Sequence, residues 1–278
     1  MNQVIKNILF RRNISVPVND GRKIVMVLNG GLMASIAGAA VLKAMAKLGL
    51  TRAFDVIYSA SMGFANGLYF LSEDMDKCTD LYLNGLADKK FINLLRFWKP
   101  ADINYGRVLF YGKSRPNVEK MFANKTKLML RLHNLTKKRI EYVDALEAGI
   151  DQYQTLMNAA ASMKYFGQGP VEYKGDKYID GQFTGFFVKD TRDFLQETIN
   201  SDATDILVIY SRRTQTKALD LKNSERVFQI FPDPDHDLFN FEINKDKLIR
   251  ACAYMEEQVQ RLFLAEERLL QKREAVSA

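Results

Sequence analysis

The sequence predicts a three-layer α/β/α fold with a largely parallel central sheet. Short apolar, β-branched runs alternate with helical patterns along most of the chain, the order expected when crossover helices connect parallel strands. The 278 residues, 47% of them hydrophobic, can bury one large core. We therefore expect a single domain over residues 1–278.

The first part of the chain consists of two strand–helix units. Each unit opens on an apolar run, turns at small residues and continues with a helical pattern. The expected elements are strands over 23–29 and 54–59 and helices over about 33–48, 61–73 and 75–85. An insertion rich in basic and aromatic residues follows over about 86–125.

The second part resumes the sheet. "KLMLRLHNL" and "KRIEYVDA" predict a hairpin, a helix ends near "AAASM", and "KYIDG" returns to a strand. A helix over about 186–198 precedes the strands "DILVIYSR" and "RVFQIFP". A last helix is expected over about 244–270, before a frayed tail. Its apolar residues recur at three- and four-residue steps and predict a face packed on the sheet: Leu248, Cys252, Met255, Val259 and Leu262.

The composition excludes several classes of protein. Cys78 and Cys252 are far apart and lack a histidine cluster, so neither a disulfide framework nor a zinc site is predicted, and no cofactor is expected. No apolar run is long enough to span a bilayer, and the N-terminus lacks the apolar core of a signal peptide. These features predict a cytoplasmic protein.

The net charge of +7 conceals one strongly basic region. Residues 86–140 hold fourteen Lys and Arg against three Asp and Glu, and aromatic residues lie between the cations. This pattern suits a peripheral contact with an anionic membrane, for which we expect Arg96, Phe97, Trp98 and Lys99. Two other interpretations are a nucleic-acid surface, which we do not expect, and a solvated charged face over core aromatics.

A serine lies at the second strand-to-helix corner, in "DVIYSASMGFANG". The small residues Ser59 and Gly63 flank Ser61, an arrangement that can expose the Ser61 hydroxyl at the edge of the sheet beside a helix N-terminus. This is how a nucleophile is presented. An ordinary strand-to-helix connection with serines near the N-cap is the alternative.

Two further segments end at the same expected edge. "LNGGLMAS" places Gly30 and Gly31 where a strand gives way to a helix, so that backbone N–H groups can bind an oxyanion or a phosphate, although a plain tight turn is also possible. "KYIDGQF" places Asp180 at a strand end, and Gly181 allows a sharp turn there.

In this order, the Gly-Gly turn, the serine corner and the Asp-Gly turn resemble the patatin-like phospholipase family. The resemblance covers most of the chain and implies a Ser-Asp dyad that hydrolyses lipid esters at a membrane, with Ser61 as nucleophile and Asp180 as general base. The N–H groups of Gly30, Gly31, Leu32 and Met62 would then form the oxyanion hole. An activating protein partner stays an open question.

The histidine content agrees with a dyad. A Ser-His-Asp triad needs a late histidine, and the chain offers only His133, in the predicted hairpin, and His236, in "DPDHDL". We interpret His236 as a loop residue.

The sequence also departs from the patatin-like pattern. Leu32, Ala34 and Ser35 stand where a third glycine, a basic residue and a further glycine are usual, and Ser59 replaces another glycine. The proline common before the aspartate strand is missing from "SMKYF". The alternative to a lipid hydrolase is therefore a catalytically weak protein that keeps the fold to bind lipid or protein.

Overall fold

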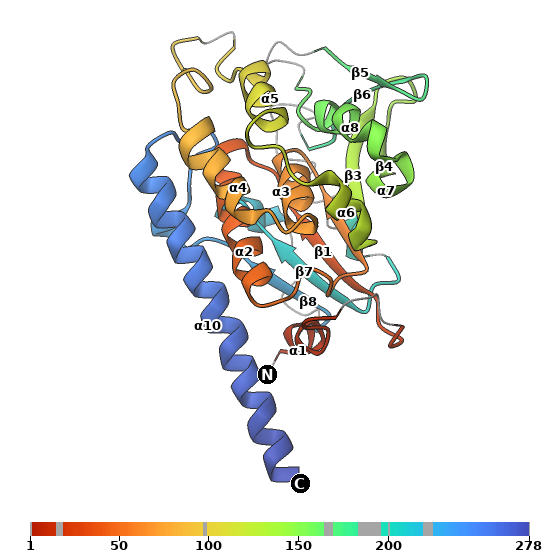
Figure 1. The fold of residues 1–278 in the computed structure, drawn as a ribbon, viewed down its shortest axis with the longest axis vertical. Helices are drawn as coiled ribbons and strands as arrows, with labels where there is room; N and C mark the ends of the chain where they lie inside the picture. Colours follow the sequence, from red (N-terminus) through yellow and green to blue (C-terminus); the bar gives the residue numbers. More distant parts are fainter. Residues whose placement is uncertain are drawn as a thin grey trace.

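The structure is a computed structural model that describes residues 2–14, 19–96, 99–163, 169–182, 196–199, 201–218 and 225–277 (Figure 1). Eight strands form one sheet in the order β5-β6-β3-β2-β1-β7-β8, with β4 paired to β3. The strands are β1 (Ile24–Leu28), β2 (Val56–Ser59), β3 (Lys127–Asn134), β4 (Arg139–Asp144), β5 (Val171–Tyr173), β6 (Asp176–Asp180), β7 (Asp205–Ile209) and β8 (Val227–Ile230).

The sheet is parallel at its centre and antiparallel at one end. β3, β2, β1, β7 and β8 run in the same direction, whereas β4, β5 and β6 pair antiparallel. Every residue of β1 and β7 is buried, which requires cover on both faces of the sheet. The predicted α/β fold class, with its mostly parallel sheet, is confirmed.

Helices flank this sheet. The α-helices are α1 (Gln3–Phe10), α2 (Ile36–Lys47), α3 (Met62–Leu71), α4 (Met75–Asp80), α5 (Ile103–Tyr111), α6 (Val118–Asn124), α7 (Ala145–Ala148), α8 (Tyr153–Ala160) and α10 (Lys245–Ser277). Shorter helical turns are η1 (Leu32–Ser35), η2 (Leu81–Leu86), η3 (Ile150–Gln152), η4 (Arg213–Ala218) and η5 (Pro234–His236). The larger core joins one face of the sheet to α2 and α3, and a smaller core lies on the other face.

Most of the predicted elements are present, but the helices differ from the prediction at several places, and α5, α6 and α7 were not expected. The apolar stripe of α10 packs chiefly on α2, so the expected contact with the sheet is wrong (Figure 1). α10 also continues to Ser277, beyond the expected end near 270, because "QKREAV" is rich in helix-forming residues. The helix α1 was not expected from the sequence. The predicted helix over 186–198 lies mostly outside the described residues.

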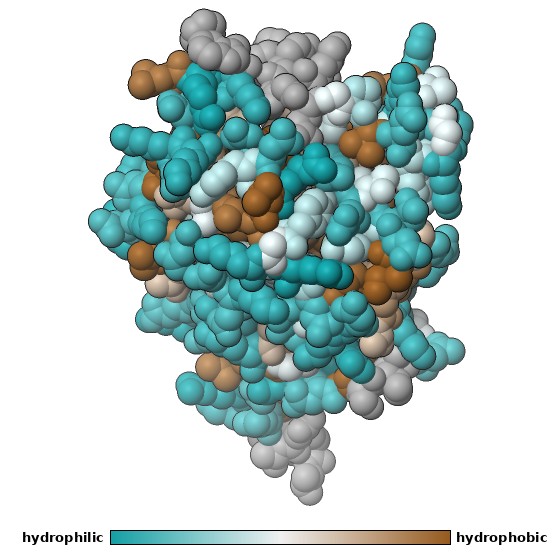
Figure 2. All heavy atoms as spheres, turned by 45° about the horizontal axis from the view of Figure 1, so that its top comes forward, coloured by the Kyte–Doolittle hydropathy of each residue, from teal (hydrophilic) through white to brown (hydrophobic). Residues whose placement is uncertain are grey.

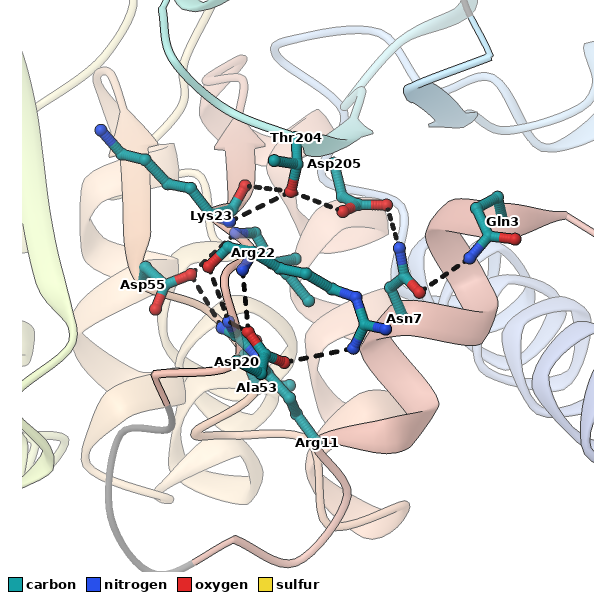
Figure 3. Close-up of polar contacts among 11 residues, drawn as sticks. Gln3, Asn7, Arg11, Asp20, Arg22, Lys23, Ala53, Asp55, Thr204 and Asp205 are labelled. Carbon is teal, nitrogen blue, oxygen red and sulfur yellow. Dashed lines mark hydrogen bonds and ion pairs between the residues drawn. The ribbon is translucent and has the colours of Figure 1, made fainter.

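A buried arginine connects α1 to the amino-terminal edge of the sheet (Figure 3). The side chain of Arg11 is 2% exposed and makes a bidentate pair with Asp20, at 2.7 and 3.2 Å, and a further ion pair with Asp55 at 2.7 Å. It also donates to the carbonyl oxygens of Arg22 and Ala53. All these acceptors are needed, because a buried guanidinium without them would be strongly destabilising.

Candidate active site

The carboxyl ends of the parallel strands bring the predicted site residues to one edge. β1 leads to Gly30 and Gly31, and β2 leads to Ser61. Ser59 of β2 is level with Leu130 of β3, and Asp180 of β6 is level with Leu132, two residues further along the same strand. Ser61 follows the end of β2 by two residues, so Ser61 and Asp180 lie toward the same edge of the sheet, on either side of β3.

Ser61 has a strained backbone at the N-cap of α3. Its φ of 52° and ψ of −134° lie outside the regions that L-residues normally adopt. The sharp turn depends on Gly63, because a Cβ there would come within 2.4 Å of the carbonyl oxygen of Leu28. The serine lies on a strand-to-helix corner, as the sequence predicts, and the strain is a finding of the structure. In the described part of the chain the Ser61 hydroxyl makes no hydrogen bond.

Ser59 is fully buried, and its Oγ donates to the carbonyl oxygen of Met129 at 3.0 Å. The serine therefore replaces the usual glycine without leaving an unsatisfied hydroxyl inside the protein.

The glycine loop is held from behind by two polar side chains. Ser211 Oγ donates to the carbonyl of Asn29 at 2.8 Å, and Gln215 Nε2 donates to that of Gly30 at 2.9 Å. In a trans peptide the N–H of the next residue points away from the carbonyl. The N–H groups of Gly30 and Gly31 therefore face away from these anchors.

The next residues of the loop have a positive φ. Gly31 has a φ of 155° and Leu32 a φ of 48°, an unusual value for a branched side chain. No acceptor among the described residues binds the N–H of Gly31, Leu32 or Met62. These donors have the type and the number that an oxyanion hole needs.

Neutral hydrogen bonds stabilise the end of this loop, where the resemblance implies a basic residue and a glycine. Ala34 and Ser35 are both buried. The carbonyl of Ser35 accepts from Asn66 Nδ2 at 2.9 Å, and its Oγ lies 3.3 Å from Ser211 Oγ.

Asp180 is 1% exposed at the end of β6. Its N–H donates to the carbonyl of Ser162 at 2.9 Å, which fixes the strand end. The next residue crosses β3 at very close range, because a Cβ on Gly181 would lie 2.6 Å from the carbonyl oxygen of Arg131. The buried guanidinium of Arg131 also donates to the carbonyl of Gly181. This turn therefore requires glycine and carries the chain back over β3.

Gln182 links the aspartate turn to the glycine loop. Its N–H donates to Asp180 Oδ1 at 2.8 Å, and its side-chain Oε1 accepts from the N–H of Gly30 at 2.7 Å. The position that a Cβ would take on Gly30 is 2.5 Å from both Gln182 Oε1 and Ser61 Cβ. The two turns and the serine corner therefore meet at Gly30.

An apolar pocket opens beside Ser61. Its free volume is about 40 Å³, so the side chains that line it nearly fill it. Leu32 and Met62 line it beside the serine, and Arg107 of α5 is the charged residue among the described lining. The other lining residues are aliphatic or aromatic and include Leu81, Leu86, Phe91, Ile103, Phe110 and Met157.

The predicted membrane residues are only partly described. Phe97 and Trp98 lie outside the described residues, while Arg96 and Lys99 are both half-buried and pair with Asp102. Other aromatic residues of the basic region belong to the core and the pocket, among them Phe91 and Phe110.

Neither histidine lines the pocket. His236 bonds to Asp233 through Nδ1 at 2.7 Å and stacks on Tyr254 of α10 at 4.1 Å, so its ring serves local packing. His133 lies within β3, beside Ile179 of β6.

The sequence did not identify Gln182, Gln215 or Ser211 as site residues. Gln182 stands directly after the Asp-Gly turn, which was a usable signal. Gln215 and Ser211 follow β7, a strand whose carboxyl end lies beside that of β1. Strand order, which the sequence does not state, was needed to find them.

No protein-family model matches the chain, and no curated protein matches its sequence. The crystal structure of VipD from Legionella pneumophila is similar, with a TM-score of 0.50 and 9% identity over 90% of this chain and 69% of VipD. The chain is similar in fold to VipD. The crystal structure of the type III effector protein ExoU gives a TM-score of 0.42 and 14% identity, over 90% of this chain and 54% of ExoU. The likeness to VipD supports the patatin-like fold that the sequence motifs imply.

Within the ranges that the structure describes, no helix combines the length and the apolar character needed to cross a bilayer. The same ranges contain no group of His, Cys, Asp and Glu side chains able to hold a metal ion.

Proposed function

We propose that the chain is a lipid acyl hydrolase of the phospholipase A type that uses Ser61 and Asp180. The observation that carries the proposal is the strained φ of 52° at Ser61, at the N-terminus of α3 and beside a pocket lined by apolar side chains. Strain of this kind persists only where the surrounding structure enforces it, and it is concentrated at functional sites.

The residues present supply each chemical step. Asp180 accepts the Ser61 proton as Oγ attacks the ester carbonyl, and the N–H groups of Gly30, Gly31, Leu32 and Met62 stabilise the resulting oxyanion. The proton passes to the leaving alcohol, which departs and leaves the acyl group on Ser61. Water then gives a proton to Asp180 and attacks the acyl carbonyl, the bond to Ser61 Oγ breaks, and Asp180 returns the proton to Oγ as the fatty acid leaves.

The pocket favours an acyl chain as the group that is transferred. Its lining offers almost no hydrogen-bond partner, so burying methylene groups there is the main source of binding free energy. Arg107 is the group suited to an anionic part of the substrate.

The proposal is tested by fatty-acid release from mixed phospholipid vesicles. We expect the purified wild-type protein to release fatty acid and Ser61→Ala to release none, with the products identified by mass. The matched control is Ser59→Ala, whose buried hydroxyl bonds to β3, and it should retain most activity. Equal release by wild type and Ser61→Ala would exclude the serine mechanism. The absence of release from any vesicle would favour the lipid- or protein-binding alternative.

We further propose that the segment from Leu94 to Lys99 contacts the membrane. Leu94 and Leu95 are 59% and 88% exposed, and they precede Phe97 and Trp98 in the chain. Figure 2 shows the surface near this region as small apolar patches among hydrophilic residues. Such patches suit a shallow contact with headgroups.

Leu95→Glu should weaken binding to anionic vesicles by about tenfold or more, because a leucine side chain gains roughly 1.5–3 kcal/mol when it leaves water. Co-sedimentation with vesicles measures the change. The control is Leu269→Glu, an exposed leucine near the projecting end of α10 (Figure 1). Equal binding by the Leu95→Glu variant and the wild type would place the membrane contact elsewhere.

A further inference from the structure

Gln182 binds a donor that the reaction needs. In the resting structure its side-chain Oε1 accepts from the N–H of Gly30 at 2.7 Å. The carbonyl of the same residue is held on the other side by Gln215 Nε2 at 2.9 Å. Two glutamines therefore bind the backbone of Gly30: Gln182 binds its N–H group and Gln215 its carbonyl oxygen.

The oxygen of Gln182 is also close to the nucleophile. A Cβ built on Gly30 would lie 2.5 Å from Gln182 Oε1 and 2.5 Å from Ser61 Cβ, so these two atoms are separated by no more than twice that distance. A carbonyl oxygen beside Ser61 that accepts a backbone N–H is what a bound ester would present.

We propose that Gln182 determines access to the oxyanion site: its side-chain carbonyl stands in for the substrate carbonyl in the resting protein, and the substrate must displace it. This inference rests on the proposed hydrolase function and adds a residue that controls which acyl compounds react. A neutral ester competes with the amide oxygen for the donor. A developing oxyanion carries charge and accepts more strongly, so it displaces the amide more readily.

The local structure allows this exchange without disturbing the general base. The backbone N–H of Gln182 stays bonded to Asp180 Oδ1 at 2.8 Å, while the contact with Gly30 is made by the side chain alone. Rotation about the side-chain bonds of Gln182 therefore frees Gly30 and leaves the aspartate turn in place.

The test is the second-order rate at which a small alkyl fluorophosphonate labels Ser61, followed by intact-protein mass. Gln182→Ala should label about three- to tenfold faster than wild type, the range that the loss of one neutral hydrogen bond predicts. Gln182→Glu should label more slowly than wild type, because a carboxylate binds the donor more tightly and places negative charge at the oxyanion site.

Gln215→Ala is the matched control. It removes a glutamine from the other side of the same residue, and it should slow labelling because the carbonyl of Gly30 loses its anchor. Ser61→Ala sets the background. The amide resonance of Gly30 in a nitrogen-15 spectrum gives a readout that does not depend on activity, and it should shift upfield in Gln182→Ala.

The outcomes separate this inference from the proposed function. Labelling of Ser61 in Gln182→Ala at or below the wild-type rate would overturn the inference and make Gln182 a positioning residue of a working hydrolase. An unshifted Gly30 amide would overturn it as well. If Ser61 is labelled in Gln182→Ala but not in wild type, the inference is supported in its strongest form. If Ser61 is labelled in neither, the proposed hydrolase function fails and the inference with it.

Discussion

Asp180→Asn should lower the rate of ester hydrolysis by about 10²- to 10⁴-fold, the range that a positioned general base contributes. The amide cannot take the proton of Ser61, yet its oxygen can still accept from the N–H of Gln182, so the turn is preserved. We therefore expect a folded protein with an unchanged melting temperature. Release of fatty acid under single-turnover conditions measures the effect.

Asp176→Asn is the control for this substitution. Asp176 lies at the other end of β6 and pairs with Lys137 at 2.6 Å, so its replacement should leave kcat within about twofold. The double variant Ser61→Ala with Asp180→Asn should be no slower than Ser61→Ala alone, because the two residues act as one unit. Substantial hydrolysis by Asp180→Asn would disprove the dyad.

The strands could be predicted because consecutive residues carry the whole of the signal for each one. β1 and β7 are short runs rich in β-branched residues and buried along their whole length, and that length and composition favour strands. The corner at Ser61 was predictable for the same reason, since Ser59, Gly63 and the strand before them are neighbours in sequence.

The environment of the basic region was not predictable in the same way. Phe91 and Phe110 lie between cations in the sequence, which suggests a surface, but both are buried. α5 turns Phe110 toward the pocket, and Phe91 packs against Gly106 of the same helix. An interleaved pattern does not show which side chains face inward until the helix is packed.

The contacts within the candidate site could not be predicted from the sequence either. Gln182 and Gln215 meet Gly30 from positions far away in the chain, and a single glutamine carries no periodic signal. Their roles follow from the order of the strands and from the crossing of Gly181 over β3. The same holds for Arg11, because the sequence around it does not indicate that Asp20 and Asp55 bind the same guanidinium.

Arg11→Ala should destabilise the protein by about 3–5 kcal/mol at neutral pH, because it removes one partner from a buried charged network and leaves two carboxylates without their cation. Figure 3 shows this network at the start of β1, where Asp55 also accepts from the N–H of Ile24 at 2.7 Å. Loss of Arg11 therefore affects α1 and the central strand together. Urea unfolding followed by circular dichroism measures the change.

The neighbouring arginine provides the control. Arg12 pairs with Glu267 of α10 at 2.8 Å, but both side chains are about one-third exposed. A pair of this kind contributes about 0–1 kcal/mol, so Arg12→Ala should be nearly neutral. Similar losses of stability in Arg11→Ala and Arg12→Ala would show that burial does not determine how much Arg11 contributes.

Lowering the pH should reduce the difference in unfolding free energy between wild type and Arg11→Ala. The hydrogen bond from Arg11 lowers the pKa of Asp20 below its usual value near 3.8. A carboxyl group with a lowered pKa in the folded state stabilises the protein above its unfolded pKa, and this contribution is lost as the pH falls through the folded value. Wild type should therefore lose more stability than Arg11→Ala between pH 5 and about pH 2. Parallel stability curves over that range would mean that Asp20 does not depend on Arg11 for its charge.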